Sequence, residues 1–402
     1  MSAARWAAGL PQEMPRGLFD PPEALAGLRG QCPVAPFRLP DGQRAWLVTS
    51  HADARAVLRD PDFSVQDRLE VRALPAIPGA FAAMDPPEHT RYRKPIAAHF
   101  STSRIRALRP RIEDIVSARL RTLRAAGPGA DLVAEFAIPV PAQVMCELAG
   151  VPYERRADFQ QSISALQKMG TDPQAAVIAS FELIDFLTPL VEAKRADPGD
   201  DIISALIHGG GAPEPFDDGE VVMMAMMLVA AGFETTASMI GLGTLALLEH
   251  PDQAALLRKD PALMATAVDE LLRYLTIMHW GVSRVARAQV PLGGHTVQPG
   301  DMVVVALNAA NRDAAAFTDP DQLDVTRRDN PHLTFSSGPH QCVGAAFARV
   351  ELEIALRGLL TEFPGLALDV PVDAVPLRSG MGIFGVHALP VRWDDTPAEE
   401  GQ

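Results

Sequence analysis

The sequence predicts a mainly α-helical protein with small β-sheets. Apolar periodicity of the helical kind covers most of the chain, and the segments with strand character are few and short. Apolar residues make up 48% of the 402 residues, which is ample for a large buried core. No Gly/Ser-rich linker, low-complexity tract or internal repeat divides the sequence, so we expect residues 1–402 to form a single domain.

The expected elements follow from these patterns in chain order. Asp217 and Asp218 are suitable caps for the longest helical run, and residues 345–356 have high helix propensity. Helices are expected at 52–58, 89–100, 111–125, 139–148, 154–169, 173–196, 201–207, 218–249, 252–258, 263–275 and 343–362. Edge-like strands are expected at 45–49, 284–290, 302–307 and 387–392, and an irregular loop at 311–330.

The composition excludes several functions. With 36 Lys and Arg against 50 Asp and Glu, the net charge is −14, which disfavours nucleic-acid binding. The cysteines Cys32, Cys146 and Cys342 give no disulfide framework, which fits a reducing compartment. Residues 1–19 lack a signal-peptide pattern, and the longest apolar run, 221–233, is too short to span a bilayer. We therefore expect a cytoplasmic protein without a membrane anchor, and a monomer by default.

The most informative stretch is a loop that surrounds one cysteine. Cys342 lies at the start of an expected helix, where free N–H groups and the helix dipole stabilise a thiolate. A thiolate suits ligation of a haem iron, where it favours O–O bond cleavage. Gly338 lets the loop turn, and Gly344 lets the backbone approach a flat macrocycle. Phe335 is placed to shield the sulfur, and His340 to meet a propionate. A lone cysteine is more often simply buried, but these companions favour the ligand.

The pattern F-x-x-G-x-H-x-C-x-G resembles the haem-binding loop of the cytochrome P-450 family. Three other segments, in the order found in that family, extend the resemblance over nearly the whole chain. The resemblance implies the cytochrome P-450 fold, with haem b between the long central helix and the cysteine loop. It implies that Cys342 ligates the iron and that electrons arrive from NAD(P)H through redox partners.

The segment AGFETT, residues 231–236, lies within the longest expected helix. Gly232 removes bulk, and Thr235 can bond to a carbonyl one turn earlier and bend the helix, opening a groove for water or dioxygen. The alternative is a helix with an ordinary polar patch. The resemblance assigns a proton relay to Glu234 and Thr235, as general acid chemistry requires. Ala231 replaces a frequent glycine of the family.

Glu270 and Arg273 are three residues apart and share one face of an expected helix. Such a pair is usually a surface ion pair that contributes little. In the family that this sequence resembles, the E-x-x-R pair is buried and binds a later arginine, for which Arg327 is the match. The arginine fork suits this contact, so the role expected for all three residues is structural.

The third segment, residues 84–93, contains tandem prolines followed by an expected helix. His89 and Arg93 are four residues apart and face the same way. The resemblance places both on the haem propionates, together with Arg284 and His340. The alternative for each residue alone is a solvated basic side chain.

The substrate pocket is expected above the haem, opposite Cys342. Its position is inferred from Glu234, Thr235 and Arg284, and an ordinary core is the alternative for these apolar side chains. The expected pocket residues are Met227, Ala230, Ala231, Trp280, Ile383 and Phe384. Residues 69–83 and 169–181 are expected to cover it.

Three functional hypotheses follow. The first is a monooxygenase that hydroxylates or epoxidises an apolar natural product such as a macrolide or another polyketide, in secondary-metabolite biosynthesis. The second is an enzyme of the same family that closes rings or couples aryl groups, on an aromatic or carrier-bound peptide substrate. The third is a non-enzymatic haem sensor, which needs no acid–alcohol pair.

The expected partners are a small apolar substrate, a ferredoxin and a ferredoxin reductase. A local basic cluster could steer an acidic ferredoxin, although a solvated helix face is an equal alternative. The cluster comprises Arg91, Arg93, Lys94, Arg104, Arg106, Arg109 and Arg111.

Overall fold

The computed structural model describes residues 15–38, 44–67, 77–168, 173–212, 214–279 and 281–394. Helices dominate these residues, as expected. They are α1 (Glu23–Gln31), α2 (His51–Arg59), α4 (Glu88–His99), α5 (Thr102–Ala126), α6 (Pro139–Ala149), α7 (Arg156–Gln167), α8 (Pro173–Ala196), α9 (Ile202–Ile207), α10 (Asp218–Glu249), α11 (Pro251–Lys259), α12 (Met264–Leu275), α13 (Leu307–Ala310) and α14 (Ala345–Glu362).

The strands form three small sheets. They are β1 (Val34–Arg38), β2 (Arg44–Val48), β3 (Phe63–Ser64), β4 (Ala130–Asp131), β5 (Val282–Ala286), β6 (Val290–Leu292), β7 (His295–Val297), β8 (Met302–Val305), β9 (Ala367–Leu368) and β10 (Pro390–Arg392). The largest sheet has the order β1-β2-β8-β5-β3, a second has the order β4-β10-β9, and β6 pairs with β7.

The strand predictions need two corrections. The four expected strands correspond to β2, β5, β8 and β10, and each of these pairs with a described strand on both sides, so none of them is an edge strand. The expected strand 302–307 is central rather than edge-like, because β8 pairs with β2 in parallel and with β5 antiparallel. All four β8 side chains are buried, so both faces of the sheet are covered at this strand. The expected strand 284–290 is split into β5 and β6, and β6 pairs only with β7 among the described strands.

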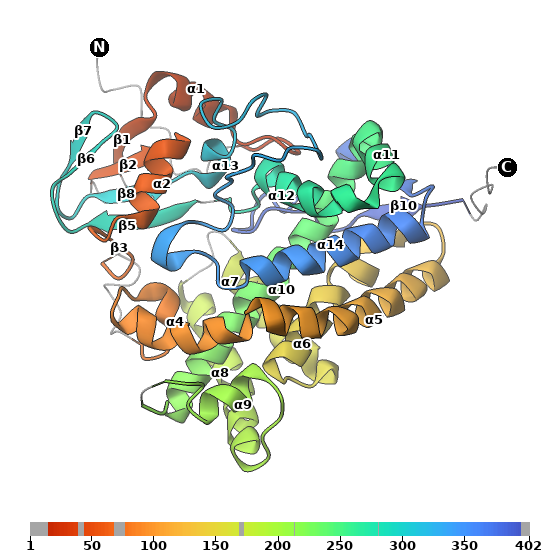
Figure 1. Ribbon diagram of the computed structural model, residues 1–402, viewed down its shortest axis with the longest axis horizontal. Coiled ribbons are helices and arrows are strands. Elements are labelled where there is room, and N and C mark those ends of the chain that lie inside the picture. The colour runs from red at the N-terminus through yellow and green to blue at the C-terminus, as the bar shows by residue number, and fades with distance from the viewer. Residues whose placement is uncertain are drawn as a thin grey trace.

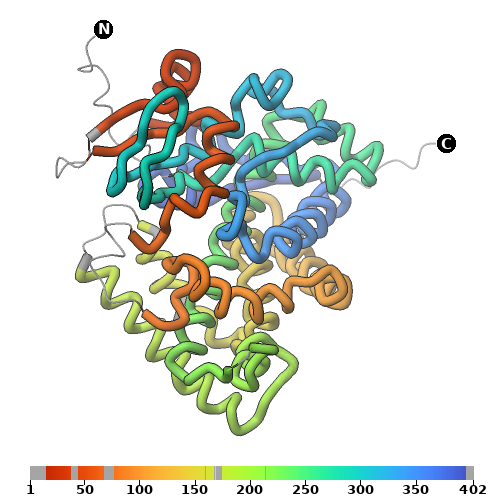
Figure 2. The backbone as a smooth tube through the Cα atoms, turned by 60° about the vertical axis from the view of Figure 1, so that its left-hand side comes forward, coloured from red at the N-terminus to blue at the C-terminus, as the bar shows by residue number. Residues whose placement is uncertain are grey.

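The sheets and the helices occupy different parts of the molecule. Figure 1 shows β1, β2, β5 and β8 beside α2, with most helices in the remaining part. Figure 2 shows the β6–β7 hairpin far from α9. α10 runs through the helical part and packs against α6, α8 and α14, while α14 packs also against α5.

α10 is the core helix of the protein. Its N-terminus carries a capping box in which the Asp217 carboxylate accepts from the Glu220 N–H and Glu220 accepts from the Asp217 N–H. The Glu220 carboxylate also accepts from Arg91, at 2.5 Å, and from the Tyr92 hydroxyl, at 2.7 Å. These bonds join the start of α10 to α4.

Two helices, α10 and the 174–196 part of α8, are long and apolar enough to cross a membrane by length and composition. In α10 the apolar residues are explained by the core, since 72% of its most apolar window is buried. The corresponding window in α8 is 28% buried.

α5 begins at Thr102, well before the expected start at 111. Pro110 lies inside it, where the sequence had indicated a boundary. The helix continues because apolar residues on both sides of the proline, including Ile105 and Ile112, are buried in the same core. Tertiary packing therefore outweighs the local cost of the proline.

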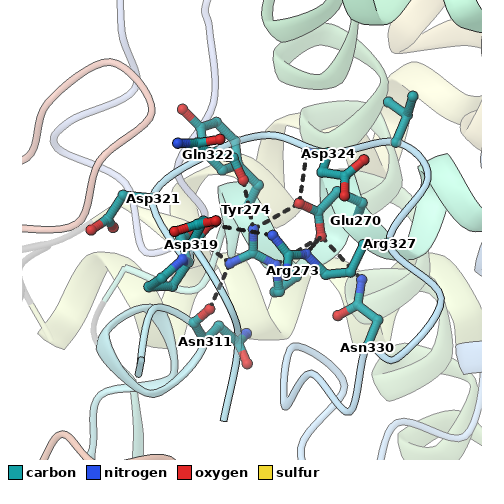
Figure 3. A network of polar contacts seen from close by, with 12 residues as sticks. Glu270, Arg273, Tyr274, Asn311, Asp319, Asp321, Gln322, Asp324, Arg327 and Asn330 are labelled. Carbon is teal, nitrogen blue, oxygen red and sulfur yellow. Dashed lines mark hydrogen bonds and ion pairs between the residues drawn. The ribbon is translucent and has the colours of Figure 1, made fainter. Parts of the chain in front are cut away.

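Residues 311–330 form an irregular segment, as expected, and α12 holds it in place (Figure 3). Arg273 and Glu270 are both fully buried and form a bidentate pair with distances of 2.7 and 2.8 Å. Arg273 also donates to the carbonyls of Asn311, Pro320 and Gln322. The Arg327 Nε donates to Glu270 at 3.0 Å. The structure thus brings these three residues together, and the pair fixes the path of the segment.

Candidate active site

The cysteine loop is shaped by its backbone. Gly338 has a φ of +76°, and a Cβ there would lie 2.6 Å from the Leu58 carbonyl oxygen, so only glycine fits. The Cys342 N–H donates to the Phe335 carbonyl at 2.8 Å, which closes the loop. At position 344, sterics within the described residues do not require glycine. An added Cβ there would contact only Phe100, at 3.7 Å.

Cys342 faces a cavity of about 520 Å³. The cysteine loop and α14 form one side of this cavity, and α4, α10 and β5 contribute the others. Many of the residues expected at the cofactor and substrate sites line it, namely His89, Arg93, Met227, Ala230, Ala231, Thr235, Arg284, Phe335, His340, Cys342 and Gly344. The structure therefore brings together side chains from four distant segments of the chain.

Burial of Cys342 favours its neutral thiol over the thiolate. Burial raises its pKa, opposed by a hydrogen bond from the Gly344 N–H and by the charges of Arg93 and Arg349. The expected stabilisation by a helix N-terminus is limited because α14 begins only at Ala345. A metal ion bound to the sulfur would supply the missing positive charge.

Four basic side chains gather at one edge of the cavity. The rings of His89 and His340 lie 4.3 Å apart, and Arg93 and Arg284 line the same edge. Burial lowers the pKa of His89 to about 4, with a further contribution from Arg93. Burial also lowers the pKa of His340 to about 3, with contributions from His89 and Arg284.

This edge fits the propionates of a haem. Both ring nitrogens of His89 are buried without a partner among the described residues. A buried donor without a partner is costly, and an anionic ligand that accepted from His89 would remove the cost. The same anion would balance the charges of Arg93 and Arg284. The apolar space next to Cys342 and the basic edge therefore match an iron porphyrin with acidic side groups.

The acid and the threonine of α10 point to different sides. Thr235 lines the cavity, and its hydroxyl donates to the Ala231 carbonyl at 2.8 Å. Glu234 is buried, is not among the described residues that line the cavity, and forms an ion pair with Arg378. Burial raises the pKa of Glu234, and Arg378 opposes that rise.

Gly232 lines the cavity, and its lack of a side chain also makes room for a neighbouring helix. A Cβ at this position would lie 2.6 Å from the Met145 sulfur, so the glycine admits the Met145 side chain of α6. Met145 also lines the cavity. α10 is continuous through this segment. The space on its cavity side is therefore shaped by the packing of α6 against it.

Two predicted pocket residues do not line the cavity. Ile383 and Phe384 are buried in the core instead. The Phe384 N–H donates to the Ile277 carbonyl, and Ile383 pairs with Met278, so their backbone is held against the end of α12. The Phe384 ring packs on His279. The positions of Ile383 and Phe384 in the sequence did not predict this backbone pairing.

The remaining pocket predictions are only partly covered by the structure. Trp280 and part of each expected covering segment, at 69–76 and 169–172, lie outside the described residues. Within the described part of the first segment, Phe81 and Ala82 line the cavity. In the second segment Phe181 of α8 is exposed.

Glu351 and Arg378 are site residues that were not predicted from the sequence. Glu351 of α14 lines the cavity and is fully buried, and its Oε1 has no partner among the described residues. Burial raises the pKa of Glu351 to about 8. The sequence contains one signal that Glu351 is buried. Glu351 follows Phe347 by four residues, so it lies on the apolar face of the helix. For Arg378, which is 144 positions from Glu234, no local pattern existed.

Comparisons with known proteins agree with this geometry. The family model described as Cytochrome P450 matches residues 159–368. Cytochrome P450-SU2 of Streptomyces griseolus is 42% identical over 384 residues, which cover 93% of this chain and 94% of that protein.

Solved structures resemble this chain over a comparable share of its length. The crystal structure of CYP105P1 in complex with filipin I has a TM-score of 0.89 and 43% identity, and covers 94% of this chain and 97% of that one. The mycinamicin VIII C21 methyl hydroxylase MycCI from Micromonospora griseorubida, bound to mycinamicin VIII, has a TM-score of 0.88 and 36% identity, with coverages of 94% and 99%. With its cysteine loop, core helix and cavity in this arrangement, the chain belongs to the cytochrome P450 family and is a P450 monooxygenase.

Proposed function

We propose that this protein is a haem-thiolate monooxygenase that hydroxylates an apolar secondary metabolite of the macrolide or polyketide type. One observation carries the proposal: Cys342 and Thr235 line the same cavity from different elements, the cysteine loop and α10. The space that they share is bordered by apolar side chains and by one basic edge. A thiolate ligand, a hydroxyl and an apolar substrate wall are the parts that this chemistry requires.

When bound, the haem supplies the activation of dioxygen, one atom of which enters the substrate while the other leaves as water. Cys342 ligates the iron through its sulfur, and Phe335 shields that sulfur from water. His89, Arg93, Arg284 and His340 bind the propionates and set the orientation of the ring. The Thr235 hydroxyl passes protons into the cavity, and Glu234 is their source.

The proposed substrate class rests on the apolar side chains that line the cavity and on the ligands in the structures of related proteins. Met227, Leu228 and Ala230 of α10, with Phe81, present apolar surface to the cavity. Apart from the basic edge, which the propionates occupy, this wall favours an apolar compound. The MycCI structure contains mycinamicin VIII and the CYP105P1 structure contains filipin I. These similarities support a macrolide or another polyketide as substrate.

The proposed electron supply is NAD(P)H, acting through a ferredoxin reductase and a ferredoxin. Four members of the basic cluster already form ion pairs, which reduces its free charge. The pairs are Arg91–Glu220, Arg104–Asp200, Arg109–Glu353 and Arg111–Glu147. Lys94 and Arg106 are exposed and provide the contact for an acidic ferredoxin. We further propose a cytoplasmic monomer.

The test is an optical titration followed by turnover. The haem-loaded protein is titrated with macrolides, terpenoids, aromatics and peptides, and a change of iron spin state identifies a compound that enters the cavity. That compound is then incubated with NADPH, a ferredoxin, its reductase and isotope-labelled dioxygen. One labelled oxygen in the product supports the proposal. Loss of hydrogen without oxygen gain would favour ring closure, and no turnover with any reductase would favour a haem sensor.

A variant separates the proton relay from the rest of the site. In Thr235→Ala, consumption of NADPH should become uncoupled from product, because protons no longer enter the cavity through the hydroxyl. Thr244→Ala is the matched control, since the Thr244 hydroxyl bonds to a carbonyl of the same helix but is buried away from the cavity. Fully coupled turnover in Thr235→Ala would contradict the relay.

A further inference from the structure

Residues 77–84, which we call the wall segment, border the mouth of the cavity. Phe81 and Ala82 line the cavity, and Ala82 is also exposed, so the cavity meets solvent here. The segment is a turn followed by a short 3₁₀ helix, Phe81–Ala83, that packs against α4. The Phe81 ring lies 6.4 Å from the ring of His89 on α4. The position of the wall segment therefore decides how wide the cavity opens.

The wall segment is anchored to α10 at Gly79. This glycine is buried and has a φ of +86°. A Cβ there would lie 2.5 Å from the Glu220 carbonyl oxygen and 2.9 Å from the Met223 Cβ, so the backbone lies directly against the start of α10. The Phe81 N–H donates to the Gly79 carbonyl at 2.8 Å. A displacement of Gly79 from α10 therefore also moves Phe81.

Tyr92 of α4 supplies the polar part of this anchor. Its hydroxyl donates to Glu220 Oε1 at 2.7 Å. Burial and this bond raise the pKa of Tyr92, and a hydrogen bond from the Gly79 N–H to the Tyr92 oxygen opposes the rise. The hydroxyl thus acts as donor and acceptor at once, between a carboxylate of α10 and the backbone of the wall segment.

The ring of Tyr92 is held by contacts that do not involve its hydroxyl. Tyr92 is 5% exposed and is not among the described residues that line the cavity. Its ring stacks on Phe216 with 5.7 Å between centroids, and Arg91 lies over it at 4.7 Å. Tyr92→Phe would keep these contacts and leave the Gly79 N–H without this acceptor. A buried N–H without a partner is costly, and movement of the wall segment toward water would remove the cost.

We propose that Tyr92 is a positioning residue for the substrate wall: its hydroxyl fixes Gly79, and through it the cavity-lining residues of the wall segment. The inference rests on the proposed function and deepens it, because it names a residue outside the cavity that limits the size of the apolar compounds that enter. A bulky compound must displace the wall segment to pass, whereas a small ligand passes without that movement.

The first test is the binding of two azoles to the ferric, haem-loaded protein, followed as the Soret shift in stopped flow. Clotrimazole is the bulky apolar probe, and imidazole is the small one. In Tyr92→Phe we expect the association and dissociation rates of clotrimazole to rise about threefold to tenfold, the factor to which one hydrogen bond corresponds. The imidazole rates should not change. Unchanged clotrimazole rates, or an equal rise for imidazole, would overturn the proposal.

Tyr153→Phe is the matched control for the azole experiment. The Tyr153 hydroxyl accepts from Arg119 at 3.0 Å and is not among the described groups that line the cavity. Loss of this hydroxyl should therefore leave the rates of both azoles at their wild-type values. A rise for clotrimazole equal to that in Tyr92→Phe would mean that the effect is not specific to the wall segment, which contradicts the proposal.

Amide hydrogen exchange locates the effect along the chain. In Tyr92→Phe, peptides that cover the wall segment should exchange about threefold to tenfold faster. Peptides that cover 217–223 at the start of α10 should keep their wild-type rates, because Arg91 still binds Glu220. Wild-type exchange in the wall segment, or an equal acceleration at 217–223, would refute the positioning role.

Gly79→Ala disturbs the same anchor from the other side, because its Cβ would press against α10. It should raise the clotrimazole rates at least as much as Tyr92→Phe does. The double variant should add little to the larger single effect, since both changes break one contact. Effects that multiply independently would show that Tyr92 does not act through Gly79.

The two proposals fail differently. Azole binding and amide exchange need no turnover, so the expected rates in a protein that oxygenates no compound would refute the monooxygenase and retain the role of Tyr92. Labelled oxygen in a product, together with wild-type clotrimazole rates in Tyr92→Phe, would retain the monooxygenase and refute the role of Tyr92.

Discussion

The imidazole rings of His89 and His340 lie 4.3 Å apart at the edge of the cavity that Cys342 faces. One ring comes from α4 and the other from the turn before the cysteine, so the contact joins two segments far apart in the chain. Both rings have lowered pKa values because they are buried. Neutral rings can each donate one hydrogen bond, and Arg93 and Arg284 supply the charge for an anion.

His89→Ala should weaken haem retention. Removal of a buried donor to a charged group costs roughly 1.5–3 kcal/mol, which corresponds to a tenfold or greater loss of affinity. The measurement is the rate of haem transfer to apomyoglobin. His208→Ala is the control, since His208 is exposed. Equal transfer rates in the two variants would contradict the propionate assignment.

Arg273→Met should strongly destabilise the fold. Glu270 would lose its buried bidentate partner and keep only the single bond from Arg327 as a charged contact, at a cost of about 3–5 kcal/mol, and the carbonyls of the 311–330 segment would lose their donor. Urea unfolding followed by circular dichroism measures the effect. In Arg124→Met, which breaks an exposed pair with Glu362, the loss should stay within about 1 kcal/mol. Similar losses in both variants would show that burial of the first pair is unimportant.

Gly338→Ala should disturb the cysteine loop. The positive φ costs about 1–2 kcal/mol for alanine, and the new Cβ would press against the Leu58 carbonyl. We expect a smaller fraction of the thiolate-ligated carbon monoxide complex and a lower unfolding midpoint. Gly30→Ala has open space at a helical position and should change neither. A wild-type spectrum in Gly338→Ala would show that the turn does not position the sulfur.

Glu351 should give the stability a characteristic pH dependence. Burial raises its pKa from 4.5 to about 8, so the folded state favours the protonated acid. The stability that this preference contributes is complete below pH 4.5 and is lost as the pH rises to about 8. Relative to Glu351→Gln, wild type should lose on the order of 5 kcal/mol over this range.

The measurement for Glu351 is urea unfolding at a series of pH values. Glu362→Gln is the control, because Glu362 is half exposed and pairs with Arg124 at the surface. A difference between wild type and Glu351→Gln that does not vary with pH would mean that the carboxyl has found a partner or water in solution.

The sequence predicted the parts of the site that depend on local chemistry. Gly338, His340 and Cys342 lie within five positions, so their spacing identified the loop directly. The helices were also predictable, because each carries its own apolar periodicity. Short strands such as β1 and β7 were missed, since strands of three to five residues have little pattern of their own.

The rest of the site depends on contacts between distant segments. Arg378 reaches Glu234 only because the C-terminal turn is bonded to residues 277–279, which follow α12, and to its own ends. Ile383 and Phe384 were wrongly expected in the pocket, because backbone pairing with Ile277 and Met278 sets which way they point. Such register is a tertiary property, and the residues themselves do not encode it locally.

The measurement that tests the central claim most directly is the optical spectrum of the purified, reduced protein with carbon monoxide. The account predicts bound haem with the red-shifted Soret band of thiolate ligation, and loss of that band in Cys342→Ser. Well-folded protein that binds no haem, or a band that survives in Cys342→Ser, would contradict the assignment of Cys342 as the iron ligand.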